Sequence, residues 1–364
     1  MTLNNVFKQG YALIIGVDQH SDDKWSLPDV KKDVDALYNV LIHPERCGYP
    51  AEQIRVLSGA EATRTAITDG LEWLQDQVAA DKNATAIVYY SGHGLQVGSH
   101  QDGHGTDTYY LLPHDGKIKN GILKASSALS AAEFADEISS LAPQRLLILL
   151  DCCHAAGMDA KGLDASLTKG KLGAVPAALF LSDSQSIEEA TSENAKGLEQ
   201  LEKGKGRAVI SSSQAHESSY MRKDGAMSIF TYHLIEALIG HAQPGDGDSN
   251  RSSDGSSDGA SEVLVSDVLS HVHRRVPESA KADANKPQHP DAKLTGNFPV
   301  ALLLGGKGVG KGMAAPDPLE LDEMPNRETG SRTISTGGGA YIEGNVTIGS
   351  GDFVGRDKVI NNRR

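Results

Sequence analysis

The stretch LLILLDCCHAAG, residues 146–157, decides the fold that we expect for this chain. Its five aliphatic residues are too few to cross a membrane and are typical of a strand buried on both faces of a sheet. The run ends on an acid, two thiols and an imidazole, and small residues follow that allow a tight turn. Because ligands of open α/β sheets bind beyond the carboxyl ends of the strands, we expect the chemistry of the protein at this point.

A second apolar strand, AIVYYSGHG at residues 86–94, ends on His93 between two glycines. If the two strands are neighbours, the His93 imidazole and a thiol of the first stretch form a pair. An adjacent imidazole lowers the pKa of a thiol and can protonate a leaving amine. A lone Cys or His at a strand end is usually an ordinary buried residue, but the two together favour a catalytic dyad.

The rest of the chain alternates between strands and helices. The pattern predicts helices over 29–42, 63–78, 130–141, 227–239 and 263–276, and strands over 11–17, 53–57, 109–112, 208–212 and 298–304. Residues 95–108 read as a polar, Gly-rich loop, and the helix at 227–239 reads as amphipathic. This alternation predicts an α/β fold with a doubly wound, mainly parallel central sheet and helices on both faces.

Composition excludes several classes of function. The net charge of −13 argues against nucleic acid as a ligand, because phosphate binding needs clustered Lys and Arg. Three cysteines, two of them adjacent, do not form a disulfide framework. No apolar run approaches the length of a spanning helix, and no signal peptide precedes Tyr11, so we expect a cytoplasmic protein that does not bind a membrane.

The motifs YSGHG (90–94) and DCCHA (151–155) resemble the two signatures of the caspase-like clan of cysteine peptidases, in particular the bacterial metacaspase-like members of peptidase family C14. The resemblance covers roughly residues 8–304, and GVD at 16–18 and FT at 230–231 belong to it. The family's second motif is usually written Asp-x-Cys-His-Ser-Gly, whereas AAG follows the histidine here.

The resemblance implies a thiol protease, a hydrolase that needs no cofactor. Cys153 would be the nucleophile and His93 the general acid/base, with no third acidic partner. The backbone N–H groups of Gly94 and Cys153 would form the oxyanion hole. Side chains alternate along a strand, so Asp151 and Cys153 share a side while Cys152 points away, as a packing residue would.

The resemblance also implies a substrate-binding pocket. It places Asp151, and Asp33 from the first helix, around the P1 side chain, and Ser91 is a further candidate for the lining. Two acids in a partly dry pocket demand a cation, and the guanidinium of Arg pairs with carboxylates bidentately. We therefore expect cleavage of protein substrates after a basic residue, with Arg preferred at P1 and Lys second. The alternative is that Asp33 is a solvated helix residue and that Asp151 caps a turn.

We expect the peptidase domain to span 1–304, with an exposed connector at 158–206 and a flexible insert at 244–260. In this clan a corresponding connector separates the large and small catalytic segments. Two readings of this connector are equally favoured: the enzyme cleaves itself within it, or it is a surface insertion that stays uncut. Residues 305–335 read as a linker, and 336–364 as a Gly-rich, β-type tail that could dock on a sensor or adaptor protein. The tail resembles short Gly-rich segments that end some bacterial signalling and conflict-system proteins, and this resemblance implies a role in bacterial signalling or defence. The competing function is a caspase-like scaffold that recruits a partner through the tail and has little or no peptidase activity.

Three further patterns invite a ligand. The run DGDSN (246–250) lacks the Gly and Glu of a calcium loop, so it favours a linker, although the calcium activation of some metacaspases leaves a calcium role open. The run GGKGVGK (305–311) lacks the Ser or Thr and the helix of a phosphate-binding loop. His100, His104 and His114 lack the companion ligands of a zinc site.

Overall fold

The computed structural model describes residues 6–304, apart from 82, 99–106, 121, 142, 153–169, 173–205, 215–216 and 243–260. All described residues belong to one unit, Met1–Asp322. The flexible insert, the linker, the tail and most of the connector lie outside them, so these domain assignments remain predictions. In the described part of the chain, every helix is too short or too polar to cross a membrane.

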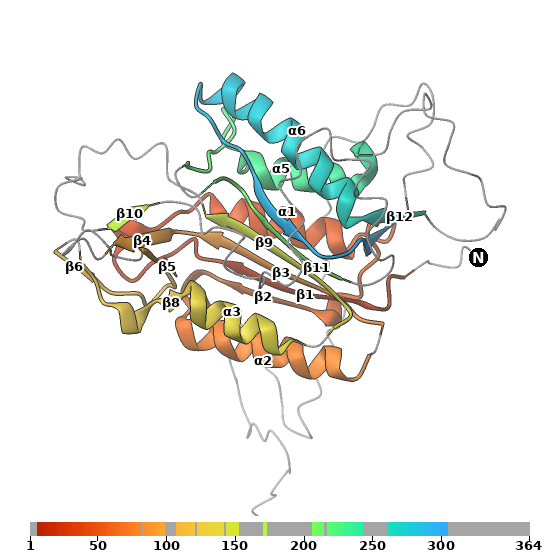
Figure 1. Ribbon diagram of the computed structural model, residues 1–364, viewed down its shortest axis with the longest axis horizontal. Helices are drawn as coiled ribbons and strands as arrows, with labels where there is room; N and C mark the ends of the chain where they lie inside the picture. Colours follow the sequence, from red (N-terminus) through yellow and green to blue (C-terminus); the bar gives the residue numbers. More distant parts are fainter. Residues whose placement is uncertain are drawn as a thin grey trace, which may run out of the picture. The chain divides into compact units, whose positions relative to one another are not determined.

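A six-stranded sheet forms the centre of the unit (Figure 1). Its strands, in order across the sheet, are β13 (Asp291–Leu294), β11 (Gly206–Ser211), β9 (Arg145–Cys152), β3 (Thr85–Gly92), β1 (Gly10–Gly16) and β2 (Ile54–Ser58). The neighbouring strands run parallel, except that β13 at the edge pairs antiparallel with β11. The predicted mainly parallel sheet is confirmed.

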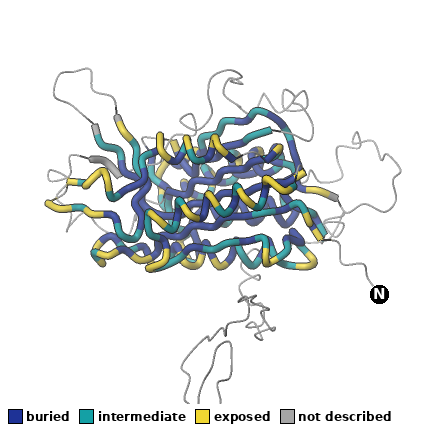
Figure 2. Tube along the Cα trace, turned by 90° about the horizontal axis from the view of Figure 1, so that it is seen from below, coloured by how far each residue is buried: buried dark blue, intermediate teal, exposed yellow. Residues whose placement is uncertain are grey.

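Helices cover both faces of this sheet, as the sequence predicts (Figure 1). One face carries α1 (Val30–Ile42), α5 (Ile229–Glu236) and α6 (Val265–Asp283), and the other carries α2 (Arg64–Ala79) and α3 (Ala131–Ser140). Strand side chains alternate between two apolar cores: Leu147 and Leu149 of β9 pack toward α1 and α5, while Ile148 packs toward α2 and α3. Figure 2 shows the strands buried between the exposed outer faces of the helices.

The predicted helix starts are confirmed at two positions. The Thr63 hydroxyl oxygen accepts a hydrogen bond from the N–H of Ala66 (3.2 Å) at the start of α2. Ser130 and Glu133 form a reciprocal capping box at the start of α3. Both caps satisfy backbone N–H groups that the first turn of a helix leaves unpaired.

The predicted loop after His93 is wrong at its first residues. Residues Gly94–Gly98 form β4, which pairs antiparallel with β5 (Asp107–Leu111). A second sheet has the order β10 (Gly170–Leu172), β4, β5, β8 (Leu129–Ser130). Strand β10 comes from the connector, which therefore contributes backbone pairing to this sheet. Leu95 packs with Trp25 and Leu112, which explains why a Gly-rich stretch is extended here.

Two other expectations are corrected. Helix α5 is not amphipathic, because almost all of its residues are buried between α1 and α6. A π-helical turn, Ala237–His241, follows α5, and Gly240 in this turn has a φ of 101°. The predicted helix 263–276 starts later and ends later, because Ser261–Leu264 form β12, which pairs with β14 (Pro299–Leu303). The remaining short elements are β6 (Ile118–Lys119), β7 (Ile122–Leu123) and the 3-10 turns η1 (Asp23–Trp25), η2 (Ala51–Gln53), η3 (Gly59–Glu61) and η4 (Ala125–Ser127).

Candidate active site

His93 lies between the end of β3 and the start of β4, and only 4% of its surface is exposed. Its Nε2 is 3.0 Å from the carbonyl oxygen of Trp25, and the Trp25 ring packs edge-on against the imidazole (centroids 5.6 Å apart, planes at 87°). A carbonyl oxygen can only accept, so Nε2 carries the hydrogen of the neutral ring and Nδ1 is the basic nitrogen. The Trp25 contacts therefore fix both the orientation and the tautomer of His93.

Strands β3 and β9 are neighbours, as a thiol–imidazole pair requires. Gly92 is the register partner of Cys152, and His93 and Cys153 are the residues that follow these two in the sequence. Cys153 itself lies outside the described residues. The Cys152 side chain is 1% exposed and packs in the core on the α2 and α3 side, in agreement with the packing role expected for it.

Asp151 is fully buried at the end of β9 and accepts hydrogen bonds from three hydroxyl groups. The Ser219 hydroxyl donates to Oδ1 (2.8 Å), the Thr231 hydroxyl donates to Oδ2 (3.0 Å), and the Ser228 hydroxyl also donates to Oδ2. Ser228 is the N-cap of α5, and its oxygen also accepts from the N–H of Thr231. Asp151 therefore lies inside the strand and holds the start of α5 through its hydrogen bonds; the turn that follows β9 lies outside the described residues, so the turn-cap alternative stays open.

Asp33 on α1 is also fully buried, which excludes the solvated alternative. Its Oδ1 accepts from the backbone N–H of Ser228 (2.8 Å), whereas its Oδ2 has no hydrogen-bond partner among the described residues. Burial first, and then the charge of Asp151, raise the pKa of the Asp33 carboxyl well above its usual range. Ser228 thus joins the two acids, one through its N–H and the other through its hydroxyl.

Two residues of β3 border the same cluster. The Tyr89 hydroxyl is 2.8 Å from the Thr231 hydroxyl, and burial followed by the charges of Asp33 and Asp151 raises the pKa of Tyr89 well above its usual range. Ser91, the third candidate, is fully buried and stands opposite Asp151 in the register. The structure therefore brings together all three residues for which we predict a pocket role.

Sequence reasoning missed the residues that support the acids. Gln288 is fully buried and donates through Nε2 to the Ser219 oxygen (3.1 Å) and to the Ser212 carbonyl (3.0 Å). Nothing in the composition around Gln288 marks it. Ser228 carries a signal that we did not use, because a serine near the start of the predicted helix 227–239 is a candidate N-cap, and the structure places the N-cap of α5 there.

The described residues add little to the other ligand hypotheses. His114 Nδ1 lies 3.0 Å from the Gln19 carbonyl, away from any grouping of metal ligands that the described part of the chain contains. His100, His104 and the runs at 246–250 and 305–311 lie outside that part. One group there has metal-ligand chemistry, and it lies on α5 and α6: His233, Glu236 and His271.

Comparison with known proteins places the chain in a family. The peptidase C14 caspase domain matches residues 9–299, which is most of the chain. No curated protein matches it. Among solved structures, caspase-1 from Spodoptera frugiperda is similar, with a TM-score of 0.43 and 15% identity over 83% of this chain and 92% of that one. The pro-sf-caspase-1 structure has a TM-score of 0.39 and 13% identity over 80% and 92%. Because the domain match spans most of its length, this chain belongs to the caspase-domain family of peptidases, as its two signature motifs predict.

Proposed function

We propose that this protein is a cysteine endopeptidase that hydrolyses peptide bonds after Arg, and next after Lys, through Cys153 and His93. The family supports peptidase chemistry on protein substrates. The single observation that carries the specificity is the pair of fully buried carboxylates, Asp33 and Asp151, that Ser228 joins.

The dyad is supported by the surroundings of His93. With Nε2 bound to the Trp25 carbonyl, Nδ1 is the atom that takes the proton from the Cys153 thiol. The thiolate attacks the substrate carbonyl carbon, and the imidazolium then gives its proton to the leaving amine. A water molecule, deprotonated by the same nitrogen, hydrolyses the thioester. Backbone N–H groups of Gly94 and Cys153 would stabilise the oxyanion in both steps.

The acidic cluster supports the preference for a cation at P1. The Asp33 pKa is raised because two carboxylates share a buried region, so a positive side chain relieves the repulsion and a negative one increases it. The Asp33 Oδ2 atom, which lacks a partner among the described residues, can accept one N–H of a guanidinium group. The planar fork of Arg can serve both acids at once, whereas Lys offers a single point charge.

The remaining parts of the proposal concern the setting of the enzyme. We place it in the cytoplasm, in bacterial signalling or defence, with residues 336–364 as the docking segment for a sensor or adaptor. Self-cleavage of the connector 158–206 is decided by comparing intact masses of the purified protein and its Cys153→Ala variant. Intact masses that differ only by the substitution itself exclude it, and a shortened chain in the unmodified protein alone establishes it.

A fluorogenic peptide with Arg at P1, with and without calcium, tests the dyad. Cys153→Ala should abolish hydrolysis, whereas the adjacent Cys152→Ala should retain it, because Cys152 packs in the core. Activity that survives Cys153→Ala would exclude the proposed nucleophile. If the folded wild-type protein shows no hydrolysis with or without calcium, the scaffold function replaces the peptidase function. A P1 library tests the pocket, and cleavage after Asp or indifference to P1 charge would refute it.

A further inference from the structure

Two imidazoles and one carboxylate meet where α5 and α6 pack together. His233 and Glu236 are one turn apart on α5, and His271 comes from α6. Glu236 Oε2 is 2.5 Å from His233 Nδ1 and 2.9 Å from His271 Nε2. All three residues are buried, and the two rings lie 6.0 Å apart between centroids. Three potential ligand atoms thus converge within 4.8 Å of one another.

The hydrogen bonds of this cluster leave one buried atom unexplained. A carboxylate only accepts, so both rings donate to Glu236 when neutral, and His233 Nε2 accepts from the Ser279 hydroxyl (2.7 Å). His271 Nδ1, however, has no hydrogen-bond partner among the described residues, although the His271 side chain is only 3% exposed.

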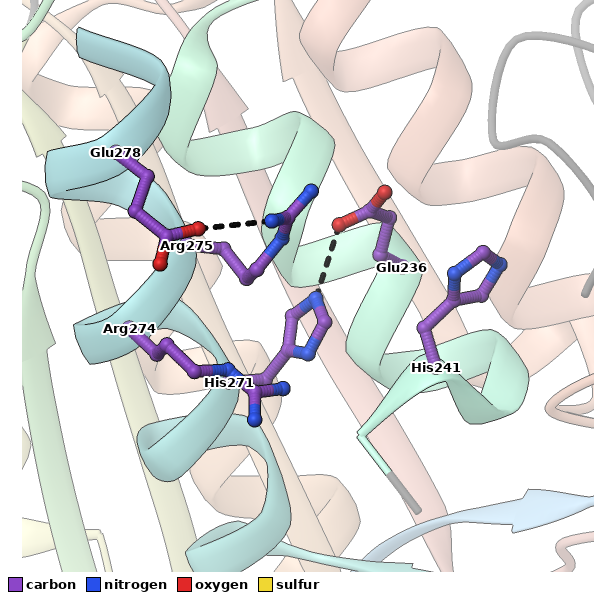
Figure 3. A pocket seen from close by; sticks show the side chains of 6 residues that line it. All are labelled: Glu236, His241, His271, Arg274, Arg275 and Glu278. Atoms are coloured by element: carbon purple, nitrogen blue, oxygen red, sulfur yellow. Dashed lines mark hydrogen bonds and ion pairs between the residues drawn. The ribbon is translucent and has the colours of Figure 1, made fainter. Parts of the chain in front are cut away.

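Figure 3 shows the pocket that this cluster borders, with Glu236 beside His271. The pocket has a volume of about 320 Å³, and its remaining lining residues are His241, Arg274, Arg275 and Glu278. Arg275 is paired with Glu278 (2.8 Å), and Arg274 is exposed to solvent, which weakens their repulsion of a cation. The pocket also gives room for a water molecule next to Glu236 and His271, which line it.

We propose that His233, Glu236 and His271 form a zinc site that fastens α5 to α6. Two imidazoles and one carboxylate suit Zn²⁺, which binds three protein ligands and one water, and they do not suit Ca²⁺, which prefers oxygen ligands. Zinc–ligand bonds of about 2.1 Å separate tetrahedral ligand atoms by about 3.3 Å. The two distances at Glu236 therefore need to widen by less than about 1 Å.

Besides this widening, zinc binding needs a change of tautomer in the two rings. The His233 proton moves from Nδ1 to Nε2 and is donated to the Ser279 oxygen, which orients the ligand as a partner of a metal-bound histidine does. The His271 proton moves from Nε2 to Nδ1, an atom that the zinc ion does not contact and that has no hydrogen-bond partner among the described residues.

The test uses the full chain without an affinity tag, in a Cys153→Ala background so that the thiol of the dyad cannot bind the metal. Protein is dialysed against Zn²⁺ and the bound metal is counted. His271→Gln should bind one ion fewer per chain than the background. His273→Gln is the matched control, because His273 is on the same helix and contacts the Leu269 carbonyl instead; it should bind as many ions as the background.

Two further measurements guard against a variant that fails to fold. Glu236→Gln, which keeps the size of the side chain, should also lose one ion. X-ray absorption of the background protein with one equivalent of zinc should show imidazole and oxygen ligands without sulfur. Equal zinc content in the background and in a folded His271→Gln or Glu236→Gln variant overturns the proposal. A sulfur ligand, or no bound zinc in the background protein, overturns it as well.

Discussion

Replacing Asp33 by Asn tests whether the acidic cluster is built for a ligand at the expense of stability. The Asn oxygen keeps the hydrogen bond from the Ser228 N–H, while a neutral amide replaces the partnerless Oδ2. An unsatisfied buried polar group costs about 1–3 kcal/mol, and more when it is charged. Because the amide is itself left without a partner, we expect a net gain of about 1–2 kcal/mol at neutral pH, or about 2–8 °C in Tm.

The pH dependence of this gain follows from the raised pKa of Asp33. Asp ionises near pH 3.9 in an unfolded chain but at higher pH in the folded protein, so the folded state binds more protons between these two values. The contribution of Asp33 to stability therefore falls as pH rises through this window. The Asn variant lacks this decline, so its advantage is close to zero below about pH 4 and complete above the folded pKa.

The assay is urea unfolding at a series of pH values, combined with hydrolysis of an Arg peptide. We expect kcat/KM to fall about 10–150-fold, as for the loss of a hydrogen bond between charged groups worth about 1.5–3 kcal/mol. Asp35→Asn is the matched control, because Asp35 is exposed on the same helix and pairs with Lys31; it should change stability by less than about 0.5 kcal/mol. If Asp33→Asn destabilises the protein more than the control at pH 7 and leaves kcat/KM unchanged, the reasoning is refuted.

Two further substitutions test the packing that positions the site. In Gly16→Ala, the new Cβ would lie 2.3 Å from Cγ2 of Val34 on α1, so α1 must shift. Urea unfolding should therefore show a loss of about 1–3 kcal/mol in the free energy of unfolding. Unchanged stability would mean that α1 packs more loosely than described. In Tyr49→Phe, the buried hydroxyl that donates to the Val300 carbonyl (2.5 Å) is removed, and the same assay should show a loss of about 1 kcal/mol. A gain in stability in this variant would contradict the assigned hydrogen bond.

Strand and helix periodicity predicted the central sheet because its strands are buried on both faces and its helices have clear apolar stripes. The same reasoning failed at Gly94–Gly98, where glycines hide a strand that is formed by pairing with β5. It also failed at α5, whose burial between α1 and α6 depends on contacts that are distant in sequence. Tertiary context decided both cases.

The candidate site likewise contains residues that the sequence predicts and residues that only the fold reveals. Asp151 and Asp33 could be predicted because motifs mark them. The hydrogen bonds that the Ser219 and Thr231 hydroxyl groups donate to Asp151 could not, although a motif marks Thr231, since both residues reach Asp151 from segments far along the chain. The Trp25 carbonyl was equally hidden, because any residue can supply a backbone oxygen. Sequence therefore identified the charged groups, and only the fold revealed the neutral groups that hold them.

The central claim is that two buried carboxylates select a positive charge at P1. The most direct measurement compares kcat/KM for two peptides that differ only in Arg or its uncharged isostere citrulline at P1. Removing one partner of a buried charge pair costs about 3–5 kcal/mol, so we predict that the Arg peptide is hydrolysed at least about 100-fold more efficiently. Equal hydrolysis of the two peptides would contradict the claim.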